Sequence, residues 1–226
     1  GLAREVARQS IVLLKNKDKL LPLKKDIRTL AVIGPNADNV YNMLGDYTAP
    51  QADGTVVTVL DGIRQKVSKE TRVLYAKGCA VRDSSRTGFK DAIETARNAD
   101  AVVMVMGGSS ARDFSSEYEE TGAAKVTINQ ISDMESGEGY DRATLHLMGR
   151  QLELLEEISR LGKPVVLVLI KGRPLLMEGA IQEAEAIVDA WYPGMQGGNA
   201  VADVLFGDYN PAGRLTLSVP RSVGQL

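Results

Sequence analysis

The sequence predicts an α/β fold, in which a mostly parallel β-sheet carries helices on both faces. Five apolar runs rich in Val, Ile and Leu recur along the 226 residues, and four of them end at or just before a glycine. Continuous apolar runs of this length are typical of parallel strands that are buried on both faces. Stretches with helical spacing lie between the runs. This alternation of strand and helix indicates a sheet that is covered on both sides.

The first predicted element is an amphipathic helix within residues 1–17. Its apolar positions are Leu2, Val6, Ile11, Val12 and Leu14. An apolar face of this kind is expected to pack against the rest of the domain. Residues 20–23 (LLPL) then lead toward the first of the five strands. Residues 1–25 are therefore interpreted as an N-terminal helix and linker.

Strands and helices are then predicted to alternate through a single domain that spans residues 1–226. The strands are expected at residues 30–34, 73–78, 101–108, 165–172 and 186–194. The helices are expected at residues 88–98, 148–161 and 197–206. A chain of this length and of 44% hydrophobic residues can bury a full core without disulfides.

Residues 107–143 interrupt this alternation with a long polar loop. Structureless loops longer than roughly 12 to 15 residues are usually functional or disordered. This one follows a predicted strand, where open parallel sheets bind their ligands. Its acidic residues include Glu117, Glu119, Glu120, Asp133, Glu135, Glu138 and Asp141. An acidic loop can be merely solvated, and that interpretation stays open at this point.

Glu138 is the candidate catalytic group in this loop. Gly137 and Gly139 flank it, and glycine lets the backbone approach a ligand closely. Arg142 can anchor the loop by pairing with a neighbouring acid. A carboxyl group among several acids is expected to resist ionisation, which suits a general acid that works near neutrality.

Composition argues against several classes of partner and cofactor. The net charge is −2 and no basic cluster is present, so neither a nucleic acid nor a membrane surface is indicated. His146 is the single histidine and Cys79 the single cysteine, which argues against a clustered nitrogen or sulfur metal site. The glycines of GEGYDR and GGSS do not match a nucleotide fingerprint. No cofactor is predicted, no compartment is assigned, and an oligomer is possible.

Several longer strings carry a family resemblance. In chain order they are QSIVLLKNKDKLLPL, LAVIGPNAD, GTVVTVLDGI, GGSS, SGEGYDR, VVLVLIKGRPL, AWYPGMQGG and VADVLFGDYNPAGRLTLSVP. Each is weak alone, but in this order the chain resembles the carboxyl-side α/β sandwich domain of glycoside hydrolase family 3. The resemblance is greatest to the β-glucosidase members and covers nearly the whole chain.

The resemblance implies a retaining β-glucosidase that releases terminal, non-reducing β-D-glucosyl residues. An N-terminal TIM-like barrel would supply the nucleophilic aspartate, and this three-layer, six-stranded sandwich would supply the acid/base glutamate. That role carries over to Glu138, with Glu135 as the fallback. The residues that would support the loop are Gly137, Gly139, Asp141 and Arg142. The partners would be a β-linked glucoside or oligosaccharide and the barrel. The chain would be one domain of a longer enzyme and inactive alone.

Two departures and two alternatives accompany the resemblance. Met195 and Gln196 stand where many members carry Gln and Glu, which puts in doubt a role for a carboxylate at that turn. The string Ser132-Asp133-Met134 only faintly resembles the nucleophile motif and is interpreted as coincidence. One alternative is a non-catalytic module that binds a carbohydrate or a protein. The other is a nucleotide-binding α/β domain, which the missing glycine fingerprints disfavour.

Overall fold

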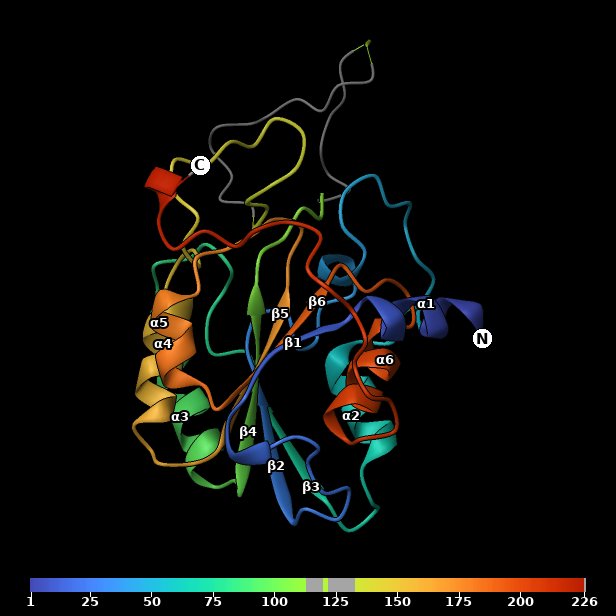
Figure 1. Ribbon diagram of the computed structural model, residues 1–226, viewed down its shortest axis with the longest axis vertical. Helices are drawn as coiled ribbons and strands as arrows, with labels where there is room; N and C mark the ends of the chain where they lie inside the picture. The colour runs from blue at the N-terminus through green and yellow to red at the C-terminus, as the bar shows by residue number, and fades with distance from the viewer. Residues whose placement is uncertain (113–119, 122–132, 226) are drawn as a thin grey trace.

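The computed structural model describes residues 1–112, 120–121 and 133–225, which form one mixed sheet between two layers of helices (Figure 1). The strands are β1 (Val12–Asn16), β2 (Thr29–Ile33), β3 (Arg72–Ala76), β4 (Ala101–Gly107), β5 (Val165–Ile170) and β6 (Ala186–Trp191). Their order across the sheet is β1-β6-β5-β4-β2-β3. The pairs from β6 to β3 are parallel, and β1 joins β6 in the antiparallel direction. The predicted fold class is confirmed.

Gly34 directly follows β2 and Gly107 ends β4, at points where a neighbouring strand lies too close for a side chain. A Cβ atom on Gly34 would lie 2.1 Å from the carbonyl oxygen of Val105, and one on Gly107 would lie 2.0 Å from that of Ile170. Both glycines also have positive φ angles, +130° and +135°. Strands β2, β4 and β5 are buried along their whole length, as their continuous apolar runs predict.

Each face of the sheet carries its own helical layer and apolar core. Helices α1 (Leu2–Ser10), α2 (Val59–Lys66) and α6 (Gly197–Leu205) pack together on one face, and α3 (Phe89–Arg97), α4 (Gln151–Ser159) and α5 (Glu178–Glu183) cover the other (Figure 1). Short 3-10 turns are η1 (Lys17–Lys19), η2 (Tyr41–Met43) and η3 (Val223–Gln225). The predicted helices at residues 88–98, 148–161 and 197–206 correspond to α3, α4 and α6. None of the helices in the described ranges has both the length and the apolar character that crossing a bilayer requires.

The N-terminal prediction is wrong beyond Ser10. The helix ends there, and residues 12–16 form β1, which pairs with β6 and closes that edge of the sheet. Val12 is buried beside β6, so the apolar residues of this segment serve a strand and not a helix face. Leu2 and Val6 are exposed on α1. Burial by tertiary pairing therefore outweighed the local helical pattern.

The loops that follow β2 and β4 meet where the strand order reverses. From β2 the chain passes to β3 on one side and then returns to β4 on the other, and such switch points are where open α/β sheets bind ligands. Asn36 donates to the carbonyl oxygen of Gly108 at 3.1 Å, and Asn42 donates to the Asn36 side-chain oxygen at 2.7 Å. Ser109 donates to Asn42 at 2.6 Å. These buried bonds fix the start of both loops.

Candidate active site

The acidic loop is attached to the end of β4 by its backbone and by Asp133. The Glu135 amide donates to the carbonyl oxygen of Ser109 at 2.8 Å. The Asp133 carboxylate accepts from the amides of Val81 and Arg82 at 3.0 and 3.3 Å. Asp133 therefore fastens the loop to the segment after β3, which agrees with the interpretation that the Ser132-Asp133-Met134 string is a coincidence. Ser132 itself lies outside the described residues.

Glu135 and Arg142 form a buried ion pair inside this loop. Their side chains are 0% and 4% exposed, respectively. Arg142 also donates to the carbonyl oxygen of His146. Gly108 makes room for the carboxylate, because a Cβ atom there would lie 2.0 Å from Glu135 Oε1. Arg142 does pair with a neighbouring acid, as the sequence predicts, and the acid is the fallback candidate.

Glu138 lies at the corner of a tight turn. The Tyr140 amide donates to the carbonyl oxygen of Gly137 at 3.2 Å, and Gly139 has a φ angle of +81°. A positive φ of this size at the third residue is the mark of a type II turn and favours glycine there. The second residue of such a turn projects outward. The Glu138 side chain is accordingly 50% exposed.

Three side chains from other segments contact Glu138. The Tyr47 hydroxyl donates to Glu138 Oε2 at 2.5 Å, and the same oxygen lies 3.4 Å from Nη2 of Arg112. The Glu138 amide donates to Asp46 Oδ2 at 3.3 Å. The hydrogen bond to Glu138 raises the pKa of the Tyr47 phenol, and partial desolvation and the nearby carboxylates raise it further.

Asp46 and Arg112 are joined by two hydrogen bonds. Arg112 Nε donates to Oδ1 at 2.7 Å and Nη2 donates to Oδ2 at 3.2 Å. Both side chains are largely buried, at 11% exposure for Arg112 and 12% for Asp46. Burial acts to lower the pKa of the Arg112 guanidinium, but its hydrogen bond to Asp46 and the charges of Asp46 and Glu138 outweigh burial and raise it.

The structure brings together only part of the predicted set. Gly137, Glu138 and Gly139 share one turn, while Asp141 is exposed on the segment after it. The sequence predicts several acids around Glu138. Among the described residues, the Glu138 side chain instead contacts the phenol of Tyr47 and the guanidinium of Arg112. Glu120 is exposed. Glu117 and Glu119 lie outside the described residues.

Sequence reasoning missed Asp46, Tyr47 and Arg112. Asp46 and Tyr47 lie in the long connection between β2 and α2, and Arg112 lies just after β4. A signal was present, because residues 34–58 form a second long connection after a predicted strand. The partners Asp46 and Arg112 are 66 residues apart in sequence, and a single sequence does not reveal such pairs.

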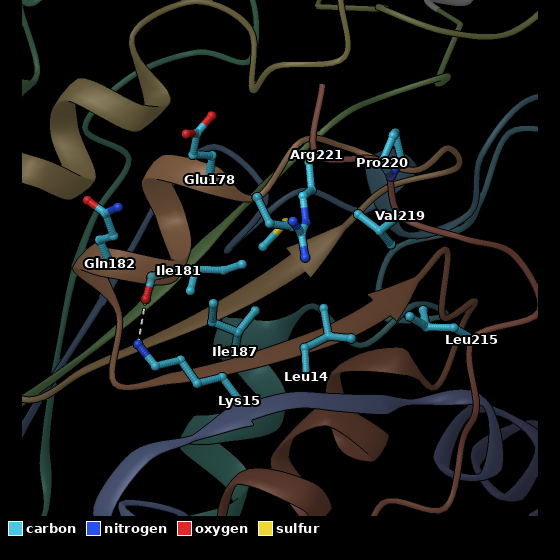
Figure 2. A pocket seen from close by; sticks show the side chains of 11 residues that line it. Leu14, Lys15, Glu178, Ile181, Gln182, Ile187, Leu215, Val219, Pro220 and Arg221 are labelled. Carbon is cyan, nitrogen blue, oxygen red and sulfur yellow. Dashed lines mark hydrogen bonds between the residues drawn. The ribbon is translucent and has the colours of Figure 1, made fainter. Parts of the chain in front are cut away.

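A separate apolar hollow of about 700 Å³ lies beside β1 and β6, at one edge of the sheet (Figure 2). Leu14 and Ile187 form its floor, Ile181 of α5 lines one side, and Leu215 and Val219 line another. None of the residues around Glu138 lines it. Among the described residues, no group of three or more His, Cys, Asp or Glu side chains could hold a metal ion.

Comparison with known proteins gives a consistent match. A family model described as the glycosyl hydrolase family 3 C-terminal domain matches residues 11–226. A β-xylosidase of Formosa agariphila is 43% identical over 99% of this chain and 28% of its own length. A periplasmic β-glucosidase of Salmonella typhimurium is 38% identical over 99% of this chain and 29% of its own length. The chain thus spans less than a third of these relatives.

Solved structures agree with the sequence matches. A β-glucosidase from Erythrobacter marinus has a TM-score of 0.81 and 35% identity, over 100% of this chain and 30% of that one. A β-glucosidase from Listeria innocua in complex with isofagomine has a TM-score of 0.79 and 29% identity, over 99% and 27% of the two chains. The similarity therefore covers sequence and fold along nearly the whole chain.

Proposed function

Since the chain belongs to glycosyl hydrolase family 3 and matches its C-terminal domain, we propose that Glu138 is the general acid/base of a retaining β-glycosidase. The observation that carries the proposal is the contrast between two carboxylates in one loop. Glu138 is half exposed at the corner of a turn, where it can reach a bound sugar. Glu135 is buried in an ion pair, where it can reach none.

Retaining cleavage needs a second carboxylate about 5 to 5.5 Å from the first. Asp46 is the described carboxylate in contact with the turn, but Arg112 engages both of its oxygens and its side chain is largely buried. It cannot swing out to attack an anomeric carbon without leaving that guanidinium. The nucleophile is therefore expected from another domain of the protein, which the resemblance implies is a TIM-like barrel.

Glu138 would act once in each of the two chemical steps. In the first, it gives its proton to the departing glycosidic oxygen while the nucleophile bonds to the anomeric carbon. In the second, its carboxylate takes a proton from the water that attacks the glycosyl-enzyme intermediate. A half-exposed turn at the loop edge of the sheet suits a group that must meet both the leaving group and water.

The proposed substrate is a terminal β-D-glucoside. A β-xyloside is the second candidate, because the 43% identical relative is named a β-xylosidase and the 38% identical one a periplasmic β-glucosidase. The two sugars differ by one hydroxymethyl group. Equal assays of 4-nitrophenyl β-glucoside and β-xyloside with the longer protein decide between them, and the preferred sugar is the one with the higher kcat/KM.

The test compares leaving groups in the longer protein that contains this chain. With Glu138→Ala we expect kcat/KM for alkyl glycosides to fall about 10² to 10⁴-fold. The loss with 2,4-dinitrophenyl glycosides should be much smaller, since that group departs without protonation, and azide should restore turnover by forming a β-glycosyl azide. Glu70→Ala removes an exposed carboxylate beside the start of β3 and serves as the matched control.

Two results would overturn the assignment. The first is that Glu138→Ala has the same kcat/KM as Glu70→Ala with every leaving group, which would leave no acid/base role at position 138. The second is that a folded Glu135→Ala variant shows the dependence on leaving group and the azide product while Glu138→Ala does not. That result would move the role to Glu135.

A further inference from the structure

Asp46 and Arg112 join two connections, and Glu138 lies further along the one that contains Arg112. Asp46 comes from the connection between β2 and α2, and Arg112 from the segment that follows β4. Their two hydrogen bonds form a planar, bidentate pair. Such a pair is more rigid and more directional than a single ion contact. It is also largely buried, so it holds one geometry without help from solvent-exposed groups.

This pair contacts the backbone of the Glu138 turn as well as its carboxylate. Asp46 Oδ2 accepts from the Glu138 amide at 3.3 Å. Arg112 Nη2 lies 3.4 Å from both the carbonyl oxygen and Oε2 of Glu138. A Cβ atom on Gly137 would lie 2.8 Å from Asp46 Oδ2, so glycine at that position is what lets the turn approach Asp46. Tyr47, the residue after Asp46, adds its hydroxyl at 2.5 Å.

We propose that the Asp46–Arg112 pair is a positioning device that sets where the Glu138 carboxyl group lies, an inference that rests on the proposed function of Glu138. Both residues act through Glu138, because the described contacts run to its amide, carbonyl and carboxylate. A general acid must come within about 2.6 to 3.2 Å of the oxygen it protonates. A displacement of about 1 Å can reduce the rate 10²-fold, so a rigid anchor for the turn has a direct kinetic consequence.

The competing explanation is that the pair only stabilises the two loops. Loss of a purely structural contact lowers the amount of folded enzyme and reduces turnover of all substrates by the same factor. Loss of a positioning contact weakens the proton transfer from Glu138 to the departing oxygen in the first step, which kcat/KM reports. It therefore reduces kcat/KM for poor leaving groups far more than for activated ones, which depart without protonation.

The experiment uses the longer protein with the variants Arg112→Met, Arg112→Lys and Asp46→Asn. For Arg112→Met we expect kcat/KM to fall about 10²-fold on an alkyl glucoside and less than about tenfold on a 2,4-dinitrophenyl glucoside. Arg112→Lys should recover only part of this loss, because an ammonium group cannot make the bidentate pair. Asp46→Asn keeps the shape of the side chain and should give a smaller loss of the same kind.

Arg86 offers a matched control. It contacts two carboxylates, Glu153 and Glu157, and lies over the ring of Phe89, as Arg112 contacts Asp46 and Glu138 and lies over Tyr47. Arg86 sits beside α3 and α4 on another part of the molecule. Arg86→Met should leave the ratio of kcat/KM values for the two leaving groups within about twofold of the parent enzyme, and a melting scan of each variant reports its folding.

The outcomes separate the positioning role from the proposed function. If Arg112→Met and Asp46→Asn reduce kcat/KM by the same factor on both leaving groups while Glu138→Ala still discriminates between them, the positioning role is overturned and the function of Glu138 stands. If Glu138→Ala also fails to discriminate, the proposed function fails and the inference falls with it. If Arg112→Met does not fold, Asp46→Asn tests the positioning role alone. A larger loss on the alkyl glucoside than on the 2,4-dinitrophenyl glucoside supports that role, and equal losses overturn it.

Discussion

Arg142 and Glu135 form a buried ion pair, and the glutamate three residues further on is half exposed. The two carboxylates lie in one loop, where Met134 and Ser136 flank Glu135 and two glycines flank Glu138. Burial and pairing make Glu135 an anchor of the loop, while the turn from Gly137 to Tyr140 presents Glu138 outward. Glu135 thus has a structural role and Glu138 is the proposed acid/base, so the two positions can be tested against each other.

Glu135→Ala should destabilise the chain strongly. The change leaves the Arg142 guanidinium buried without its carboxylate, and breaking a buried ion pair in this way costs about 3 to 5 kcal/mol. Urea unfolding gives the free energy directly. Glu138→Ala is the matched control, since a half-exposed carboxylate should change the free energy of unfolding by less than about 1 kcal/mol. Equal effects of the two substitutions would contradict the assignment of Glu135 as the anchor.

Lys171 and Asp189 form a second buried pair, at the ends of β5 and β6. Lys171 Nζ lies 2.6 Å from Asp189 Oδ2, their side chains are 2% and 0% exposed, and Nζ is 3.9 Å from the centre of the Trp191 ring. Desolvation lowers the pKa of Lys171 and raises that of Asp189. Both groups are therefore sensitive to loss of the partner.

Removing one partner of this pair should cost more than removing both. Lys171→Met is expected to lower the free energy of unfolding by about 3 to 5 kcal/mol, because it leaves a buried carboxylate unpaired. The double variant Lys171→Met/Asp189→Leu should be less destabilised than Lys171→Met alone, because it leaves no unpaired buried charge. A double-mutant cycle from urea unfolding measures the coupling. Strict additivity would show that the two charges do not depend on each other.

The stability of the chain should fall between about pH 4 and pH 2. Hydrogen bonds from Lys25 and Lys66 lower the pKa of Asp208 to about 2. Burial acts to raise the pKa of Asp203, but hydrogen bonds from Arg4 and Lys66 outweigh it and lower the value. The pKa of an aspartate in the unfolded chain is about 3.9. The unfolded state therefore binds more protons than the native state in this window, and the free energy of unfolding decreases as the pH falls.

Urea midpoints measured from pH 5 to pH 2 check this dependence. The Asp208→Asn variant removes one of the two groups, so its midpoint should decline less steeply over the same range. Above pH 5 these two groups should add little pH dependence, because both are ionised in either state and their stabilising contribution is fully present. An identical slope for the parent and Asp208→Asn would mean that Asp208 does not carry this linkage.

The 226-residue chain alone should not hydrolyse glycosides measurably. General acid/base assistance is worth roughly 10² to 10⁴ in rate, about 2.7 to 5.4 kcal/mol, whereas enzymes typically lower barriers by about 8 to 23 kcal/mol. Glu138 without a nucleophile therefore falls far short. Release of 4-nitrophenol from 4-nitrophenyl β-glucoside is the measurement, with Glu138→Ala as the blank. Turnover near that of a complete glycosidase would contradict the split of the two carboxylates between domains.

The sequence predicts the sheet well because buried strands have a local signature. The strands at residues 101–107 and 165–170 are apolar throughout, and both are central in the sheet. The apolar run at residues 11–14 is shorter and is followed by Lys15, and its segment forms a strand by pairing with β6. The flanking glycines and the family resemblance make Glu138 a candidate, and its catalytic role stays a prediction. The sequence does not point to Asp46 and Arg112, because their contact joins loops that are distant in sequence.

The most direct test of the central claim is a structure of the longer protein with a glucoside analogue bound. The measured quantity is the distance from the Glu138 carboxyl group to the glycosidic oxygen. We expect hydrogen-bond distance, with a carboxylate of the other domain about 5 to 5.5 Å from Glu138 across the sugar. A Glu138 side chain that points into solvent, away from the bound glycoside, would contradict it.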